Sequence, residues 1–147
     1  MRTHKNVRVS IELFIIGSWD GYGALGAGPD ILDIQVPNLG TLLHSSFFND
    51  TEGDDALLKL QSFPDPYMMG FHPGYTGAFS AKSLGFTDVW DGITNHRDAV
   101  YKLDYTFAHT GPSVQLTFNG LTVSEGGITT LTGDENWGIG NLIISTD

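Results

Sequence analysis

The sequence predicts an all-β protein: an antiparallel β-sandwich of the jelly-roll type, with little or no helix. Three observations support this. Apolar residues alternate with polar ones along much of the chain, glycine is abundant with 19 residues, and only 16% of residues are charged. Alternation with a period of two is typical of strands with one buried face. Solvent-exposed faces of amphipathic helices are rich in charged residues, so the low charge content argues against such helices. We expect the 147 residues to form one domain, residues 1–147, which is long enough to bury a core.

The chain is strongly acidic and has no cysteine. It carries 17 acids against 7 bases, for a net charge of −10. This charge repels nucleic acid, so we expect no nucleic-acid partner, and the lack of cysteine excludes disulfides and thiolate metal sites. The aliphatic stretch at residues 13–16 is too short to cross a membrane, so no membrane insertion is expected. Arg8 and Glu12 interrupt any signal-peptide pattern, so an export signal would already have been removed.

The first half of the chain contains three strand patterns. Residues 7–15 alternate over a long stretch, which predicts a half-buried strand. A second strand is predicted at residues 32–36, before Pro37, and a third, more loosely patterned, at residues 41–48. Only residues 54–61 have a composition compatible with helix, and they would make a couple of turns at most.

The second half predicts a hairpin and two shorter strands. Residues 99–107 alternate, a turn follows at residues 109–112, and the alternation resumes over residues 114–118, so we expect these two strands to pair. Asn119-Gly120 is a strong turn signal. Two further strands are then expected at residues 121–123 and 141–145.

All three tryptophans lie beside glycine and acidic residues. The segments are Trp19-Asp20-Gly21, Trp90-Asp91-Gly92 and Asp134-Glu135-Asn136-Trp137-Gly138. Glycine lets the backbone turn sharply, and carboxylates together with turn carbonyls are the ligands that calcium prefers. The pattern therefore indicates a calcium site, with Asp20, Asp30, Asp134 and Glu135 as its side-chain ligands. The alternative is that each tryptophan closes an end of the sandwich while the acids only face solvent.

Two of these segments resemble a group of bacterial exported jelly-roll modules. The group's pattern runs from a strand through Ser-Trp-Asp-Gly and a glycine-rich turn to Pro-Asp, and residues 18–21 and 28–31 match it. Residues 134–139 match its closing Asp-Glu-x-Trp-Gly-Ile, and the strand at residues 101–107 with its Ala-His-Thr-Gly-Pro turn also fits. The match covers both ends and the penultimate hairpin, and the middle of the chain fits poorly.

The resemblance implies a secreted or cell-surface, non-catalytic sandwich. Such modules are similar to carbohydrate-binding modules and concanavalin-like domains, and they often carry a structural calcium. The group usually has Asp-Asn after Trp-Gly-Ile, whereas this chain has Gly140-Asn141. A calcium site that depends on that carboxylate would be weakened or moved here.

The acids and histidines do not show the spacing of a catalytic site. A glycoside hydrolase needs two carboxylates flanking one bond, but the adjacent Asp134 and Glu135 would point to opposite faces of a strand. The five histidines show no His-x-His or His-Glu-x-x-His spacing, and Gly-x-Ser-x-Gly is absent. We therefore predict that the protein is not an enzyme.

Residues 63–79 carry an aromatic residue at every fourth position. Prolines and glycines between the rings exclude a helix, so we expect a long loop. Aromatic faces stack on the apolar face of a sugar ring. The candidate residues for binding a carbohydrate or surface polymer are Tyr67, Phe71, Tyr75 and Trp90.

Two alternatives to ligand binding stay open for this loop. In the first, its rings fold back and cover an open end of the sandwich. In the second, the protein is a structural subunit of a surface layer or filament, and the rings contact a neighbouring chain. The long first strand would then be available to pair with the sheet edge of another copy.

Overall fold

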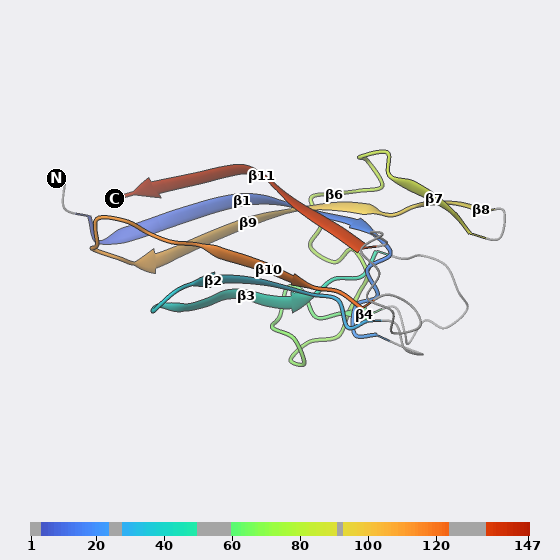
Figure 1. The fold of residues 1–147 in the computed structure, drawn as a ribbon, viewed down its shortest axis with the longest axis horizontal. Helices are drawn as coiled ribbons and strands as arrows, with labels where there is room; N and C mark the ends of the chain where they lie inside the picture. The colour runs from blue at the N-terminus through green and yellow to red at the C-terminus, as the bar shows by residue number, and fades with distance from the viewer. Residues whose placement is uncertain (1–3, 24–27, 50–59, 91–92, 124–134) are drawn as a thin grey trace.

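The computed structural model describes residues 4–23, 28–49, 60–90, 93–123 and 135–147, and all regular structure in these residues is β-strand (Figure 1). No helix that could span a membrane occurs in this part of the chain. The prediction of an all-β protein with antiparallel sheets is confirmed.

Two antiparallel sheets lie face to face as two layers (Figure 1). The larger sheet has the order β11 (Glu135–Thr146), β1 (Asn6–Gly17), β9 (Asp98–Ala108) and β6 (Ser80–Ala81). The smaller sheet has the order β10 (Thr117–Leu121), β2 (Ile31–Val36) and β3 (Gly40–Ser46). Two short pairs complete the described strands: β4 (Leu60–Gln61) with β5 (His72–Pro73), and β7 (Thr87–Trp90) with β8 (Ile93–His96). This order is that of a sandwich, and it does not establish the jelly-roll topology, which stays a prediction.

The core fills the space between the layers with alternate residues of the long strands. In β1 the buried residues are Val7, Val9, Ile11, Leu13 and Ile15, which is the pattern the alternation predicted. Leu32 and Ile34 of β2 face them from the smaller sheet, and the large rings of Trp19, Phe47 and Tyr101 fill the rest. Burial of these side chains supplies most of the driving force that holds the layers together.

β1 lies inside its sheet, where it pairs with β11 on one side and with β9 on the other. The expectation that the first strand is available to another chain is therefore wrong. The free edge of this sheet on that side belongs to β11.

The predicted hairpin between residues 99–107 and 114–118 is also wrong. β9 pairs with β1 and β6, whereas β10 pairs with β2, so the turn at residues 109–112 carries the chain from one sheet to the other. A turn signal shows where the chain reverses but does not specify the sheet in which it continues.

Asn119 and Gly120 lie inside β10 and do not form the expected turn. Trp137 packs against Gly120 so closely that a Cβ there would collide with the indole nitrogen. The glycine thus permits contact between the sheets. No separate strand follows at residues 121–123, because Leu121 ends β10, and the last strand begins at Glu135 instead of at residue 141. Of the segment with helical composition, residues 54–59 lie outside the described residues, and Leu60–Gln61 forms β4.

Candidate metal centre and aromatic surface

Three carboxylates from distant parts of the chain meet at one end of the sandwich. Asp20 follows β1, Asp30 directly precedes β2, and Glu135 begins β11. One oxygen of each lies within 4.8 Å of the others. Calcium binds oxygens at about 2.3–2.6 Å, so two ligands of one ion lie at most about 5 Å apart. The spacing of this acid cluster (Asp20, Asp30 and Glu135) therefore fits a single calcium ion, while the fourth predicted ligand, Asp134, lies outside the described residues.

A tight turn places Asp20 next to Asp30. Gly21 has a φ of 60°, and a Cβ there would collide with the carbonyl of Leu60, so only glycine fits. The Gly21 amide donates to the Phe47 carbonyl at 2.8 Å, and the Asp30 amide donates to the Gly21 carbonyl at 3.2 Å. These bonds fix the turn against both neighbouring segments, so the acids are held together by backbone geometry.

Asp30 is fully buried, and its carboxylate joins two other segments. One oxygen accepts the Asp20 amide at 2.6 Å, and the other accepts the Val123 amide at 2.9 Å. Two N–H donors favour the ionised carboxylate. A carboxylate oxygen has two lone pairs, so accepting one N–H does not by itself prevent that oxygen from binding an ion.

Trp19, which precedes Asp20 in the chain, is also fully buried. Its indole N–H donates to the Asn136 carbonyl at 2.9 Å, and its backbone amide donates to Asn49 Oδ1 at 3.0 Å. The ring meets Phe47 edge-on at a centroid distance of 6.1 Å. Trp19 thus closes this end of the core, as the alternative interpretation of the tryptophan segments expects, and it links the turn of Asp20 to the start of β11.

A stack of three rings lies beside this turn. Tyr22 stacks on Tyr67 at a centroid distance of 5.3 Å and on Phe71 at 4.7 Å. The Tyr22 hydroxyl also donates to the Gly70 carbonyl. Phe71 is 65% exposed. We call Tyr22, Tyr67 and Phe71 the aromatic surface. Tyr22 is not among the rings predicted from the sequence, although its position in the turn, two residues after Asp20, is a local signal for it.

Polar groups flank the aromatic surface. His44 meets the Tyr67 ring edge-on at 5.9 Å, and its Nδ1 lies 2.5 Å from the Asp33 carboxylate. His72 pairs with Asp65 at 2.9 Å in the same segment of the chain. Burial, followed by the nearby Tyr22, raises the pKa of the Tyr67 hydroxyl, which stays protonated at neutral pH. Rings flanked by hydrogen-bonding groups can bind a ligand with both apolar and hydroxyl-bearing faces.

The other two ring candidates are placed differently. The Tyr75 hydroxyl donates to the Asn49 carbonyl at 2.5 Å, and the ring packs against the core. Tyr75, like Phe63, therefore packs against the core, while Tyr67 and Phe71 lie in the aromatic surface. Trp90 is the last residue of β7 and pairs with Ile93.

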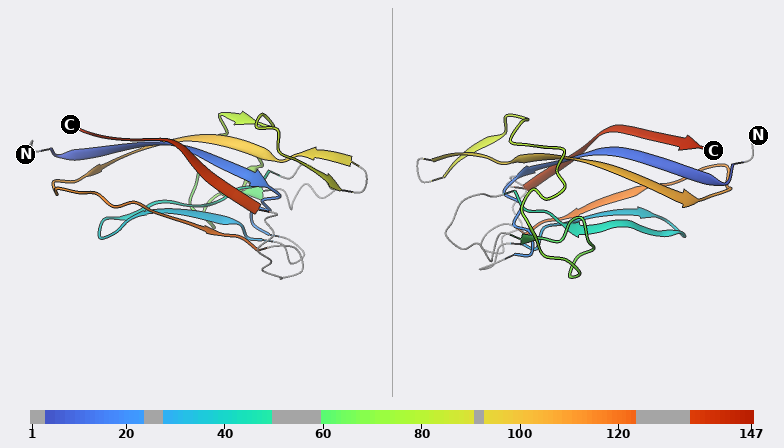
Figure 2. Two further views of the ribbon diagram at one scale, coloured as in Figure 1. Left: turned by 45° about the horizontal axis from the view of Figure 1, so that its top comes forward. Right: turned by 180° about the vertical axis from the view of Figure 1, so that it is seen from behind.

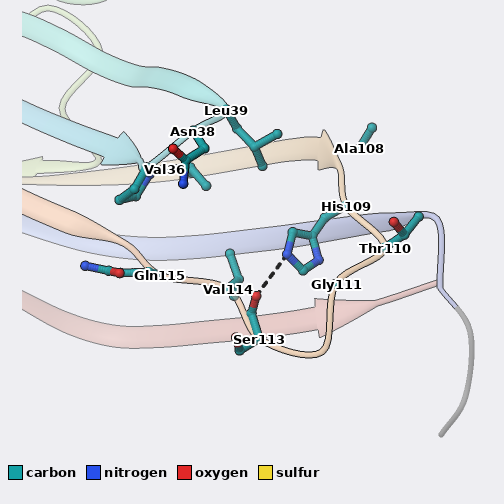
Figure 3. Close-up of a pocket in the computed structure, with 11 residues that line it drawn as sticks. Val36, Asn38, Leu39, Ala108, His109, Thr110, Gly111, Ser113, Val114 and Gln115 are labelled. Carbon is teal, nitrogen blue, oxygen red and sulfur yellow. Dashed lines mark hydrogen bonds between the residues drawn. The ribbon is translucent and has the colours of Figure 1, made fainter.

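An open cavity of about 550 Å³ lies at the opposite end of the sandwich (Figure 3). It is lined by the turn between β2 and β3 and by residues 108–115. His109 borders it, with Nε2 3.0 Å from the Ser113 carbonyl and Nδ1 3.0 Å from Nε2 of His4. The hydrogen bonds of both His109 nitrogens lie within the protein, so this ring has a structural role at the chain reversal.

No family model, no curated protein and no solved structure matches this chain. The resemblance to exported jelly-roll modules therefore stays a prediction, and the proposals below rest on the geometry of the chain itself.

Proposed function

We propose that this protein is a non-catalytic extracellular or cell-surface module, stabilised by calcium, that binds a carbohydrate or surface polymer through its aromatic surface. The observation that carries the proposal is the turn from Asp20 to Tyr22. Asp20, at the start of this turn, belongs to the acid cluster, and Tyr22, at its end, is the ring on which both Tyr67 and Phe71 stack. An ion on Asp20 would hold the turn and so position Tyr22.

Electrostatics support a cation at the acid cluster. Three carboxylates within 4.8 Å repel one another, and the repulsion is strongest where Asp30 is fully buried. A divalent cation removes this repulsion and gains oxygen ligands from three segments at once. Such an ion would join the end of β1, the start of β2 and the start of β11.

Thermal melting with calcium and with a chelator tests the metal site. Calcium at about a hundredfold above its dissociation constant should stabilise the fold by about 2.7 kcal/mol, because the ion binds only the folded state. Asp20→Asn should abolish the shift, whereas Asp104→Asn, which changes an exposed acid on β9, should retain it. Equal melting temperatures in calcium and in chelator, for protein stripped of metal under denaturing conditions and refolded, would contradict the calcium proposal.

Binding to a panel of polysaccharides tests the aromatic surface. Phe71→Ala should weaken binding roughly fivefold, since one stacked ring contributes about 1 kcal/mol. Phe79→Ala is a matched control, because Phe79 is equally exposed at 65% but lies under the Lys102 ammonium group outside the aromatic surface. Loss of binding in both variants, or in neither, would contradict the assignment of the surface.

The same assay links the two parts of the proposal. If the turn couples them, chelator should weaken binding by the wild type as well as lowering its melting temperature. Binding that is unchanged in chelator would separate the aromatic surface from the metal site.

A further inference from the structure

The free edge of β11 has the properties of a strand that pairs with another strand. The order of the larger sheet places β11 at its edge, and no strand in the described part of the chain pairs with its outer side. Its last residues, Leu142–Thr146 in the sequence, carry no charge. Leu142, Ile143 and Ile144 are 44%, 61% and 45% exposed. Unpaired backbone groups beside exposed apolar side chains form a template for strand addition.

The other sheet edges are covered, charged or short. Residues 62–67 cover β3, where the Tyr67 amide donates to the His44 carbonyl at 2.7 Å. β6 pairs with the first part of β9, and Lys102 and Asp104 place charges farther along that strand. β10 spans only five residues. Charges and coverage prevent edge-to-edge association, and the segment Leu142–Thr146 of β11 has no charge and no covering strand among the described residues.

A bulge divides β11 into two parts. The register with β1 shifts between Ser10 and Glu12, and Asn141 in the opposing strand has a φ of 47°. Beyond it the pairing is regular, from Ile143 opposite Ser10 to Thr146 opposite Val7. Ile143 and Ile144 belong to this regular segment, whereas Asn141 and Leu142 lie at the bulge. A pair centred on Ile143 therefore places the regular half of each copy opposite the bulged half of the other.

We propose that β11 pairs in antiparallel fashion with β11 of a second copy of this chain. The sequence of the segment is complementary to itself when the two-fold axis passes through Ile143. Ile143 then faces its own counterpart, and Leu142 of one copy faces Ile144 of the other. Asn141 faces Ser145, so apolar side chains meet apolar ones and polar side chains meet polar ones. An isologous pair of this kind closes after two copies.

The flanking charges are complementary in the same register. Arg8 lies beside Ser145 in the β1–β11 pairing, and Asn141 Nδ2 donates to the Glu12 carboxylate at 2.5 Å. Since Ser145 of one copy faces Asn141 of the other, Arg8 lies in line with Glu12 of the second copy. Arg8 of one copy and Glu12 of the other therefore lie along one line of cross-strand neighbours at the interface between the two β11 strands. The two-fold axis produces this arrangement twice. Within each copy Arg8 bonds to Asp104 at 3.0 Å and Glu12 lies 3.7 Å from Lys102, so this line of neighbours places no unpaired like charges at the interface. The general repulsion between two copies with a net charge of −10 each still opposes association and is screened by salt.

Sedimentation equilibrium over a range of protein concentrations tests the proposal. The wild type should dimerise, and Ile143→Lys should raise the dimer dissociation constant at least tenfold, because two like charges would meet at the axis. Thr41→Lys adds the same charge to an exposed position on β3, in the other sheet, and should leave the constant unchanged. A wild type that stays monomeric up to millimolar concentration, or an Ile143→Lys variant that dimerises as well as the wild type, would overturn the proposal.

Single-cysteine variants test the register. Because the chain has no cysteine, Ile143→Cys should form a disulfide between two copies under mild oxidation. Opposite residues in an antiparallel pair have Cβ atoms about 5 Å apart, which is close enough for a bond after a small adjustment. Ser145→Cys should not crosslink, because its counterpart lies four residues along the strand, about 13 Å away. Equal crosslinking at both positions would contradict the proposed register.

Discussion

The two long sides of the sandwich are closed in different ways. On the side of β9 and β3, residues 60–82 pass from one layer to the other and bond to both (Figure 2). The Phe63 amide donates to the Ser46 carbonyl at 3.2 Å, and the Phe79 amide donates to the Val100 carbonyl at 2.7 Å. On the side of β11, no strand in the described residues crosses the edge, and the layers meet where Trp137 packs on Gly120. We call these the covered side and the open side.

This difference separates stability from interaction. The covered side buries polar groups and rings that depend on one another, so substitutions there should unfold the protein. The open side exposes apolar side chains whose neighbours are mostly solvent, so substitutions there should change association and leave the folded chain almost unaffected. The predictions below test that separation, beginning with the largest expected effect.

Gln61→Leu should cause the largest loss of stability. Gln61 is fully buried at the centre of the covered side. Its side-chain oxygen accepts three hydrogen bonds, from the amides of Phe48 and Tyr75 and the hydroxyl of Tyr101. Its side-chain nitrogen donates two, to the carbonyls of Phe63 and Thr76. Leucine has a similar volume and leaves these groups without a bond, at a cost of about 1–3 kcal/mol for each group that stays buried.

We expect a destabilisation of at least about 3 kcal/mol in denaturant unfolding, since more than one of these groups loses its bond. Gln61→Glu is a useful companion, because it keeps the acceptor and removes the donors. A loss below about 1 kcal/mol for Gln61→Leu would show that the network does not close the covered side.

The sequence predicts the long strands with one buried face better than it predicts the two sides of the sandwich. Alternation alone identifies β1, β2 and β9 closely, because one face of each strand is buried against the other layer. It cannot specify the pairing of the strands, so the predicted hairpin after β9 is wrong. The covered side depends on single polar contacts between distant segments. Gln61 belonged to a segment with helical composition, and nothing local in its sequence indicates its five hydrogen bonds.

The candidate site shows the same contrast. Asp20, Asp30 and Glu135 stand out in the sequence because each lies in a segment with an unusual tryptophan, glycine or proline pattern, and the structure brings these three together. The rings at residues 63–79 share one spacing, yet Tyr67 and Phe71 lie in the aromatic surface while Tyr75 closes the core. In a loop, side chains spaced four residues apart need not point in the same direction, because each turn reorients the backbone.

Asp147→Asn should have an intermediate effect that depends on pH. The carboxylate of Asp147 accepts the backbone amides of Asn6 at 2.8 Å and Lys5 at 2.9 Å, and it also accepts the side-chain amide of Asn6. These donors, with the Asn6 amide as the largest contribution, lower the pKa of Asp147 to about 2. The folded state therefore favours the charged form. The stabilisation is present above the ordinary pKa near 3.8 and is lost as the pH falls through about 2.

Thermal melts between about pH 5 and about pH 2 measure this contribution, because that range runs from roughly one unit above the ordinary pKa of 3.8 down to the lowered pKa of about 2. The melting temperature of Asp147→Asn should lie a few degrees below that of the wild type at the upper limit and approach it at the lower limit. A constant difference across the range would show that the substitution acts through packing and not through the charge.

Ile143→Ser should have the smallest effect on the folded monomer. Ile143 is 61% exposed on the outer edge, so replacing it removes little buried area, and the change in unfolding free energy should stay within about 0.5 kcal/mol. The unfolding free energies of the wild type and the variant should be compared at a protein concentration low enough to keep the wild type monomeric. As the concentration rises, pairing of β11 should raise the melting temperature of the wild type, because association stabilises the folded state by mass action. The melting temperature of the variant should stay constant over the same range. A loss of several kcal/mol in the dilute variant would mean that this side chain supports the sandwich itself, and the distinction between the covered and open sides would then fail.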